Sequence, residues 1–170
     1  MKKISFACLA AFSLLAFTTV SGGAQATGSG PVLSVVGDFD HDATVDTAVF
    51  ERADLDAMPN DSFETTTIWT EGPQVFSGVY LDTLLSSLGT FDGTLQVVAI
   101  NDYMVSIPLT EIAAGGALLA TRRNGDQMSV RDKGPFWIVY PYDADDAFRN
   151  EVIYSRSVWQ VKELRITPPE

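Results

Sequence analysis

Hydrophobic positions along the chain fall into short runs separated by turn residues. Runs that are rich in β-branched and aromatic side chains, and that are bounded by Gly, Pro, Asn or Asp, are typical of strands. The pattern predicts strands at residues 32–36, 64–70, 95–100, 103–107, 117–123, 127–130 and 158–166, beside a strongly apolar run at 136–140 and a short run of undecided type at 47–50.

Helical spacing is confined to a few short segments. Leucines at positions 81, 84, 85 and 88 predict an amphipathic helix over residues 80–88, which Gly89 ends. Leu55 and Met58 predict another helix over residues 51–58, which Pro59 stops. Weaker helical segments are expected at residues 108–113 and 145–154.

The order of these elements indicates the fold class. Asn124-Gly125 between two strand-like runs is a hairpin signal. Many strands, a few short helices and no regular alternation of the two predict an α+β fold with a mixed sheet or a partly closed barrel. Residues 27–170 are the right length for a single domain with a hydrophobic core.

The N-terminus has the features of a secretory signal peptide over residues 1–26. Lys2 and Lys3 precede a mostly apolar run at 4–20, and the small-residue triplet Ala24-Gln25-Ala26 follows as a cleavage site. We therefore expect a periplasmic or secreted protein. No later segment approaches the ~20 apolar residues that span a bilayer, so no membrane span is expected after cleavage.

Charge and cysteine content narrow the chemistry. The chain has a net charge of −11, and removal of Lys2 and Lys3 lowers it to −13, so the surface is expected to repel nucleic acid and anionic membranes. Cleavage also removes Cys8, the only cysteine. With no thiol and with His41 as the one histidine, thiol catalysis and a standard zinc site are not expected.

An acidic loop offers one candidate metal site. Its alternating carboxylates belong to Asp38, Asp40, Asp42 and Asp46. Oxygen ligands in this pattern suit calcium, as in EF-hand loops. However, Ala43 and Val49 stand where an EF-hand has its glycine and its bidentate glutamate. The alternatives are a calcium site and a solvated acidic turn in which His41 is exposed.

Two further groups of residues are candidates for ligand binding. Arg122, Arg123, Arg131 and Lys133 are close in sequence and could form a positive spot for an anionic ligand, or could be surface residues that pair with the abundant carboxylates. A tryptophan could provide the flat wall of a pocket, whereas Trp137, inside Phe-Trp-Ile-Val-Tyr, is expected in the core.

Five segments in a shared order resemble the molybdopterin-binding domain of the sulfite-oxidase family, and in particular its short exported stand-alone members. They are FSGVYLDTLL (76–85), NDYMVSIPL (101–109), LLATRRNGDQM (118–128), KGPFWIVYP (133–141) and SVWQVKELRI (157–166). The resemblance implies that family's fold. It also implies a cofactor cleft formed by Trp69, Asn101, Tyr103, Arg122, Arg123 and Lys133.

The chain departs from this family at the metal ligand. The family's molybdenum-binding cysteine would fall near residues 65–71, where this chain has Thr-Thr-Thr-Ile-Trp-Thr-Glu. We therefore expect a binding or accessory module without molybdenum catalysis, whose partner is a small anionic ligand or another protein. A molybdopterin-dependent oxidoreductase and a calcium-stabilised interaction protein are the alternatives.

Overall fold

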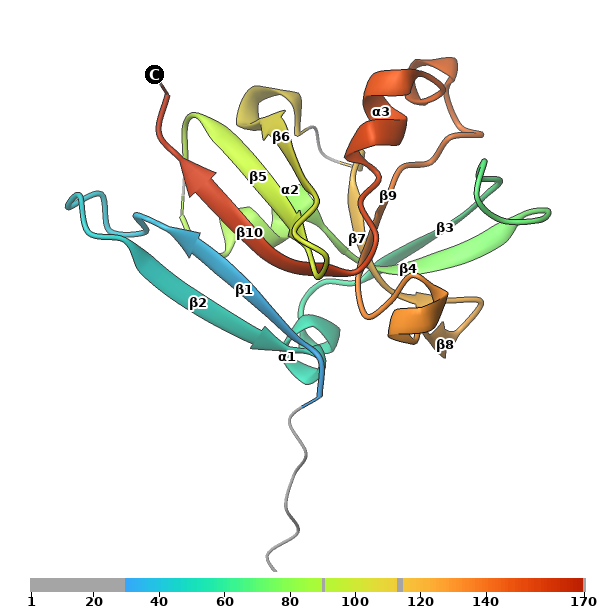
Figure 1. The fold of residues 1–170 in the computed structure, drawn as a ribbon, viewed down its shortest axis with the longest axis horizontal. Helices are drawn as coiled ribbons and strands as arrows, with labels where there is room; N and C mark the ends of the chain where they lie inside the picture. Colours follow the sequence, from blue (N-terminus) through green and yellow to red (C-terminus); the bar gives the residue numbers. More distant parts are fainter. Residues whose placement is uncertain (1–29, 90, 113–114, 170) are drawn as a thin grey trace, which may run out of the picture.

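The computed structural model describes residues 30–89, 91–112 and 115–169. The predicted signal peptide lies outside these residues. Within them, two β-sheets and a few short helices form an α+β fold, as expected (Figure 1). Among the described residues, no helix combines the length and apolar character needed to cross a membrane.

The first sheet, sheet A, is mixed. Its order is β2-β1-β10-β5-β6, with β1 and β10 parallel and the other neighbours antiparallel. In β1, alternate residues such as Leu33 and Val35 point into the core, as the period of two in a strand requires. Its strands are β1 (Val32–Gly37), β2 (Asp46–Glu51), β5 (Thr94–Ala99), β6 (Met104–Pro108) and β10 (Val161–Thr167).

The second sheet, sheet B, is antiparallel, and β7 is its central strand. The order is β3-β4-β7-β8, and β9 pairs with the β7 residues that precede the β8 pairing. The β7–β8 hairpin turns at Asn124 and Gly125, both at positive φ, which confirms the hairpin prediction. Its strands are β3 (Asp61–Thr65), β4 (Gln74–Tyr80), β7 (Leu118–Arg123), β8 (Asp126–Gln127) and β9 (Trp137–Val139).

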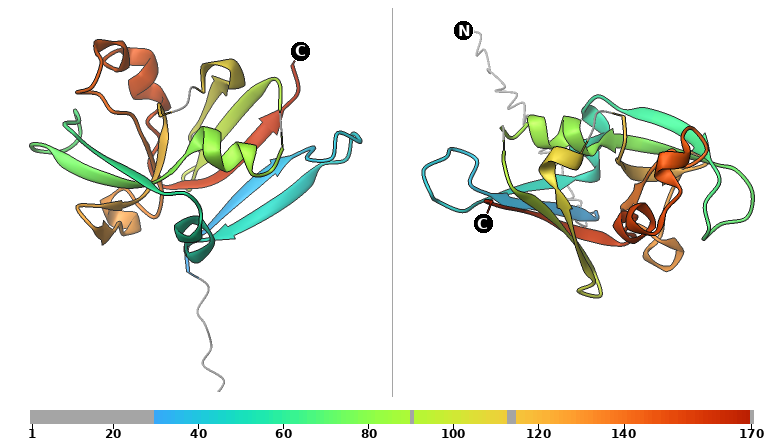
Figure 2. Two further views of the ribbon diagram at one scale, coloured as in Figure 1. Left: turned by 180° about the vertical axis from the view of Figure 1, so that it is seen from behind. Right: turned by 90° about the horizontal axis from the view of Figure 1, so that it is seen from above.

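The helices are short. They are α1 (Arg52–Ala57), α2 (Leu81–Ser86), α3 (Glu151–Arg156) and 3₁₀ turns at Leu109–Glu111, Val130–Asp132 and Asp146–Phe148. The prediction of α2 is confirmed, and its Leu81, Leu84 and Leu85 are buried. Figure 2 shows α2 from behind, where it continues from β4 and lies in front of sheet A.

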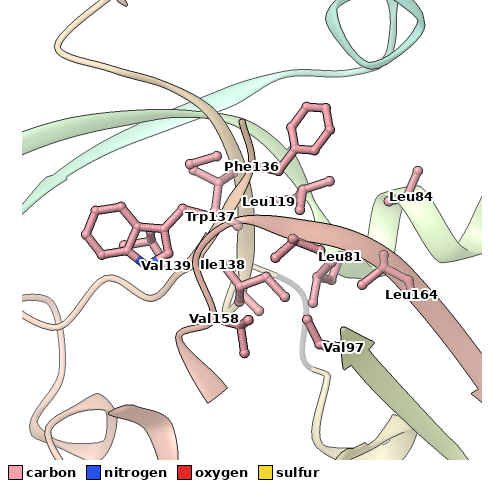
Figure 3. Close-up of a cluster of buried hydrophobic side chains, with 14 of the residues drawn as sticks. Leu81, Leu84, Val97, Leu119, Phe136, Trp137, Ile138, Val139, Val158 and Leu164 are labelled. Carbon is pink, nitrogen blue, oxygen red and sulfur yellow. The ribbon is translucent and has the colours of Figure 1, made fainter. Parts of the chain in front are cut away.

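The two sheets share one hydrophobic core where β9 meets the start of β10. The Ile138 N–H donates to the Val158 carbonyl over 2.8 Å, and the Val161 N–H donates to the Phe136 carbonyl over 3.0 Å. Figure 3 shows side chains from α2 and from both sheets packed together at this junction. The junction also holds Trp137, which is fully buried, as predicted.

One charged side chain, Arg52 of α1, is buried against sheet B. Its guanidinium donates to the carbonyls of Thr121 (2.5 Å) and Pro135 (3.4 Å) and lies 5.4 Å from the Phe136 ring centroid. Its Nε has no hydrogen-bond partner within the described part of the chain. Burial lowers the pKa of this arginine, so the two carbonyls are important for keeping the charge inside.

Element predictions for sheet B are wrong at three places. The expected strand at 127–130 is limited to β8, which ends at Gln127, and Val130 begins a 3₁₀ turn. The expected strand at 64–70 ends at Thr65, because Thr66 and Thr67 form hydrogen bonds that begin a loop. Strand β4 was not predicted, because Gly78 resembles a turn signal. In fact a Cβ at Gly78 would lie 2.1 Å from the Leu119 carbonyl oxygen, so glycine permits close approach of β4 to β7.

The described residues form two sheets and no closed barrel, so the mixed sheet is the part of the fold prediction that the structure has. The two sheets diverge from the junction (Figure 1). β2 and β6 are the two edges of sheet A, and neither pairs with a strand of sheet B.

Candidate ligand-binding site

A cavity of about 370 Å³ lies where the β5–β6 turn, α3 and the start of β10 come together with the loop that follows β3. Four of its nine lining residues are aromatic, and the other five are small, aliphatic or polar without a formal charge. The lining residues are Trp69, Ala99, Asn101, Tyr103, Tyr154, Ser155, Ser157, Val158 and Trp159.

Trp69 is the centre of an aromatic cluster that forms one wall of this pocket. Its ring centroid lies 5.7 Å from Trp159, 5.9 Å from Tyr154, 6.0 Å from Trp137 and 6.3 Å from Tyr142. All four contacts are edge-to-face, the arrangement that the ring quadrupole favours. All three tryptophans of the chain belong to this cluster.

The loop that contains Trp69 is attached to the segment before α3 by one carboxylate. Asp143 accepts hydrogen bonds from the backbone N–H of Thr66 (2.5 Å) and from its hydroxyl (2.8 Å). Arg149 pairs with the same carboxylate over 2.6 Å. The Thr66 hydrogen bonds and the arginine lower the pKa of Asp143, so the carboxylate is charged at neutral pH and holds the loop in place.

Below the wall, Ser157 connects α3 to the aromatic cluster. Its hydroxyl donates to the carbonyl of Ile153 over 2.8 Å, so the hydroxyl oxygen is left to accept from Tyr142 over 2.6 Å. The indole N–H of Trp137 donates to the Ser157 carbonyl over 3.3 Å. Burial raises the pKa of Tyr142, which therefore remains a neutral donor.

The mouth of the pocket is formed by the β5–β6 turn. The Tyr103 hydroxyl donates to the Ser155 carbonyl over 3.3 Å, which closes one side. Asn101 is exposed there, and its side-chain oxygen accepts from the Tyr103 backbone N–H. The segments that form the pocket also carry exposed apolar side chains outside its lining, namely Ile68, Ile100, Met104 and Val152.

The structure brings together three of the six residues expected in the cleft. Trp69, Asn101 and Tyr103 all line the pocket. Lys133 is adjacent, with Nζ 4.3 Å from the centroid of the Trp159 ring that forms part of the lining.

Arg122 and Arg123 do not line this pocket. Arg122 makes a two-pronged pair with Asp56 of α1, at 2.6 and 2.7 Å. This pair lowers the pKa of Asp56 and raises that of Arg122. Arg123 pairs with Asp132 over 2.6 Å. Both arginines therefore pair β7 with neighbouring carboxylates. This agrees with the second interpretation of the basic segment, in which its cations are surface residues paired with carboxylates.

The residues from α3 to β10 were missed as lining residues. Tyr154, Ser155 and Ser157 enter the pocket because α3 ends beside the β5–β6 turn. No motif marks them in the sequence. The available signal was the concentration of hydroxyl and aromatic side chains between a predicted helix and a predicted strand.

The acidic loop gives calcium no grouped ligand set. The Asp38 carboxylate accepts from the backbone N–H groups of Asp42 (3.1 Å) and Ala43 (2.9 Å), and Asp42 accepts from Thr44. Across the described residues, no three Asp, Glu, His or Cys side chains are placed to hold a metal ion. His41 is exposed, as expected for a surface turn.

The pocket residues do not fit a molybdenum cofactor. Residues 65–71, where the sulfite-oxidase family has its cysteine ligand, contribute the indole of Trp69 to the wall. The remaining lining offers amide, hydroxyl and carbonyl groups and no thiolate, carboxylate or imidazole. No protein-family model matches the chain, and a search of curated proteins finds no match.

Proposed function

We propose that this protein is a periplasmic or secreted binding module that holds a small flat ring compound in the aromatic pocket, on a shortened sulfite-oxidase-like domain and without molybdenum catalysis. One observation supports this most directly: Trp69, Tyr154 and Trp159 line the same cavity as Asn101 and two serines. Three residues that the family resemblance assigned to a cofactor cleft belong to that lining.

The pocket has the chemistry of a ring-binding site. Aromatic walls provide a large apolar contact area for a flat ligand, and a few polar groups at the edge fix its orientation. Here Asn101 and the exposed Ser155 can provide those edge contacts. A cavity of about 370 Å³ is within the range of small-molecule sites.

The lining supports binding better than catalysis. A nucleophile needs an adjacent general base, and a general acid or base needs a pKa near the working pH. Ser157 is the buried hydroxyl of the pocket, but its proton is donated to Ile153 and its oxygen accepts from Tyr142. Since burial raises the pKa of Tyr142, this pair has no base that could activate the serine.

Nuclear magnetic resonance of the tryptophan side chains tests the proposal. Because all three tryptophans are in the cluster, their three indole N–H signals report on the pocket. Titration with free pterin, a flat neutral ring, should shift the signals of Trp69 and Trp159. The Trp137 signal should move less, since Trp137 is fully buried and its N–H is bonded to Ser157.

Two variants make the test specific. Trp69→Ala should abolish the shifts because it removes the centre of the wall. Phe63→Leu, which changes an aromatic residue of sheet B outside the lining, should leave them unchanged. The absence of any saturable shift with pterin, or the same shifts in Trp69→Ala, would contradict the proposed function.

A further inference from the structure

Lys133 places a positive charge directly on the aromatic wall. It follows the 3₁₀ turn Val130–Asp132, and its φ of +65° turns the chain toward Gly134. The ammonium lies 4.3 Å from the ring centroid of Trp159 and 5.6 Å from that of Trp137. Both distances are within the ~6 Å of a cation–π interaction.

This charge is not neutralised by a neighbouring carboxylate. The arginines around it, Arg122 and Arg123, each pair with an aspartate over 2.6 Å. Within the described part of the chain, Lys133 and the exposed Arg131 have no carboxylate within 4.0 Å. Lys133 is therefore a local positive charge in a chain whose net charge is −11.

The position of the ammonium has a consequence for any ligand that touches Trp159. The negative face of an indole attracts a cation, but here Lys133 already interacts with that π-system. The residues that line the pocket have no charged side chain of their own. Lys133 contacts a lining residue without itself lining the cavity, and its charge disfavours cationic ligands and favours anionic ones.

We infer that Lys133 determines the charge preference of the pocket, and that the ligand is a flat ring that bears an acidic group such as a carboxylate. This inference rests on the proposed function, because it concerns the same pocket. In this inference Lys133 is the source of anion selectivity, in place of Arg122 and Arg123, which pair with carboxylates.

Two probes with the same ring separate charge from shape. Pterin and pterin-6-carboxylate would be titrated calorimetrically into wild type at low and high salt. We expect the carboxylate to bind roughly tenfold more tightly at low salt, as for a partly exposed charge interaction over several ångströms. High salt should reduce this preference and leave the affinity for neutral pterin unchanged.

Three variants assign the preference to one residue. Lys133→Gln should remove the preference, and Lys133→Arg should keep it because the positive charge is retained. Arg131→Gln is the control: it removes a nearby unpaired charge that makes no cation–π contact with Trp159, and it should behave as wild type. Circular dichroism and melting curves would establish that each variant is folded.

The outcomes distinguish this inference from the proposed function. If neutral pterin and its carboxylate both fail to bind wild type, the proposed function is wrong and this inference is wrong with it. If both probes bind with equal affinity, or if Lys133→Gln retains a salt-sensitive preference, only the inference is overturned.

Discussion

The attachment of the Trp69 loop by Asp143 leads to a prediction that connects stability to the pocket. In Asp143→Asn the shape of the side chain is kept and the charge is lost. The two hydrogen bonds from Thr66 are weakened, and the 2.6 Å ion pair with Arg149 is removed. The loop should therefore become less stable, and the aromatic wall should move with it.

The expected size follows from the exposure of these groups. A hydrogen bond to a charged group is worth ~1.5–3 kcal/mol when buried, and an exposed ion pair ~0.2–1 kcal/mol. The Asp143 side chain is 33% exposed and the Arg149 side chain is 46% exposed. Solvent screening therefore reduces the contributions of the hydrogen bonds and of the ion pair. We expect a loss of about 1–2 kcal/mol and a decrease in melting temperature of about 3–8 °C.

Asp146→Asn is a matched control. Asp146 also faces Arg149, at 3.7 Å, but its side chain is 98% exposed and makes no hydrogen bond to Thr66. Denaturation of both variants, followed by tryptophan emission, should show a change in the Trp69 environment only in Asp143→Asn. Equal stabilities and identical emission spectra for the two variants would refute the role given to Asp143.

The effect should also depend on pH. The pKa of Asp143 is lowered in the folded state from its ordinary value of 3.8. A lowered pKa means that the carboxylate stabilises the protein above about pH 3.8, and that this contribution is lost as pH falls through the folded-state pKa. The difference between wild type and Asp143→Asn should be full at pH 7 and should decrease below pH 3.8.

Three further changes test other parts of the description. Arg52→Ala should cost about 3–5 kcal/mol in urea denaturation, because it empties a buried site and leaves two carbonyls without a donor; a loss below 1 kcal/mol would contradict this. Calcium should leave the melting temperature of chelator-treated protein unchanged in wild type and in Asp40→Ala; a wild-type increase that Asp40→Ala abolishes would restore the calcium hypothesis. Intact-mass measurement of the exported protein should give an N-terminus at Thr27; a retained leader in the membrane fraction would contradict export.

Local signals in the sequence were sufficient where one short segment determines its own conformation. The leucine spacing of α2 and the Asn124-Gly125 turn are of this kind, and both are present as predicted. Strand β4 was not predicted from its own segment. Gly78 is required there because the Leu119 carbonyl of a distant strand comes too close for a side chain. The loop after Thr65 depends in the same way on Asp143, more than seventy positions away.

The candidate site was likewise predicted only in part. Trp69, Asn101 and Tyr103 were expected together from a family resemblance, and they line one cavity. The two arginines were grouped by their proximity in sequence, but the side chain of Arg122 is directed by Asp56 of α1. A list of cations does not reveal which of them are already neutralised, and this is decided by tertiary pairing.

The position of β10 within sheet A affects the order in which the protein can fold. β10 is the last strand along the chain, yet it lies between β1 and β5, and Ser34 of β1 pairs in register with Glu163. Until β10 is available, the β1–β2 and β5–β6 hairpins have no strand to join them, and an isolated hairpin is at best marginally stable. Sheet A therefore cannot assemble on the ribosome before residues 161–167 have emerged, so its two hairpins wait for the end of the chain.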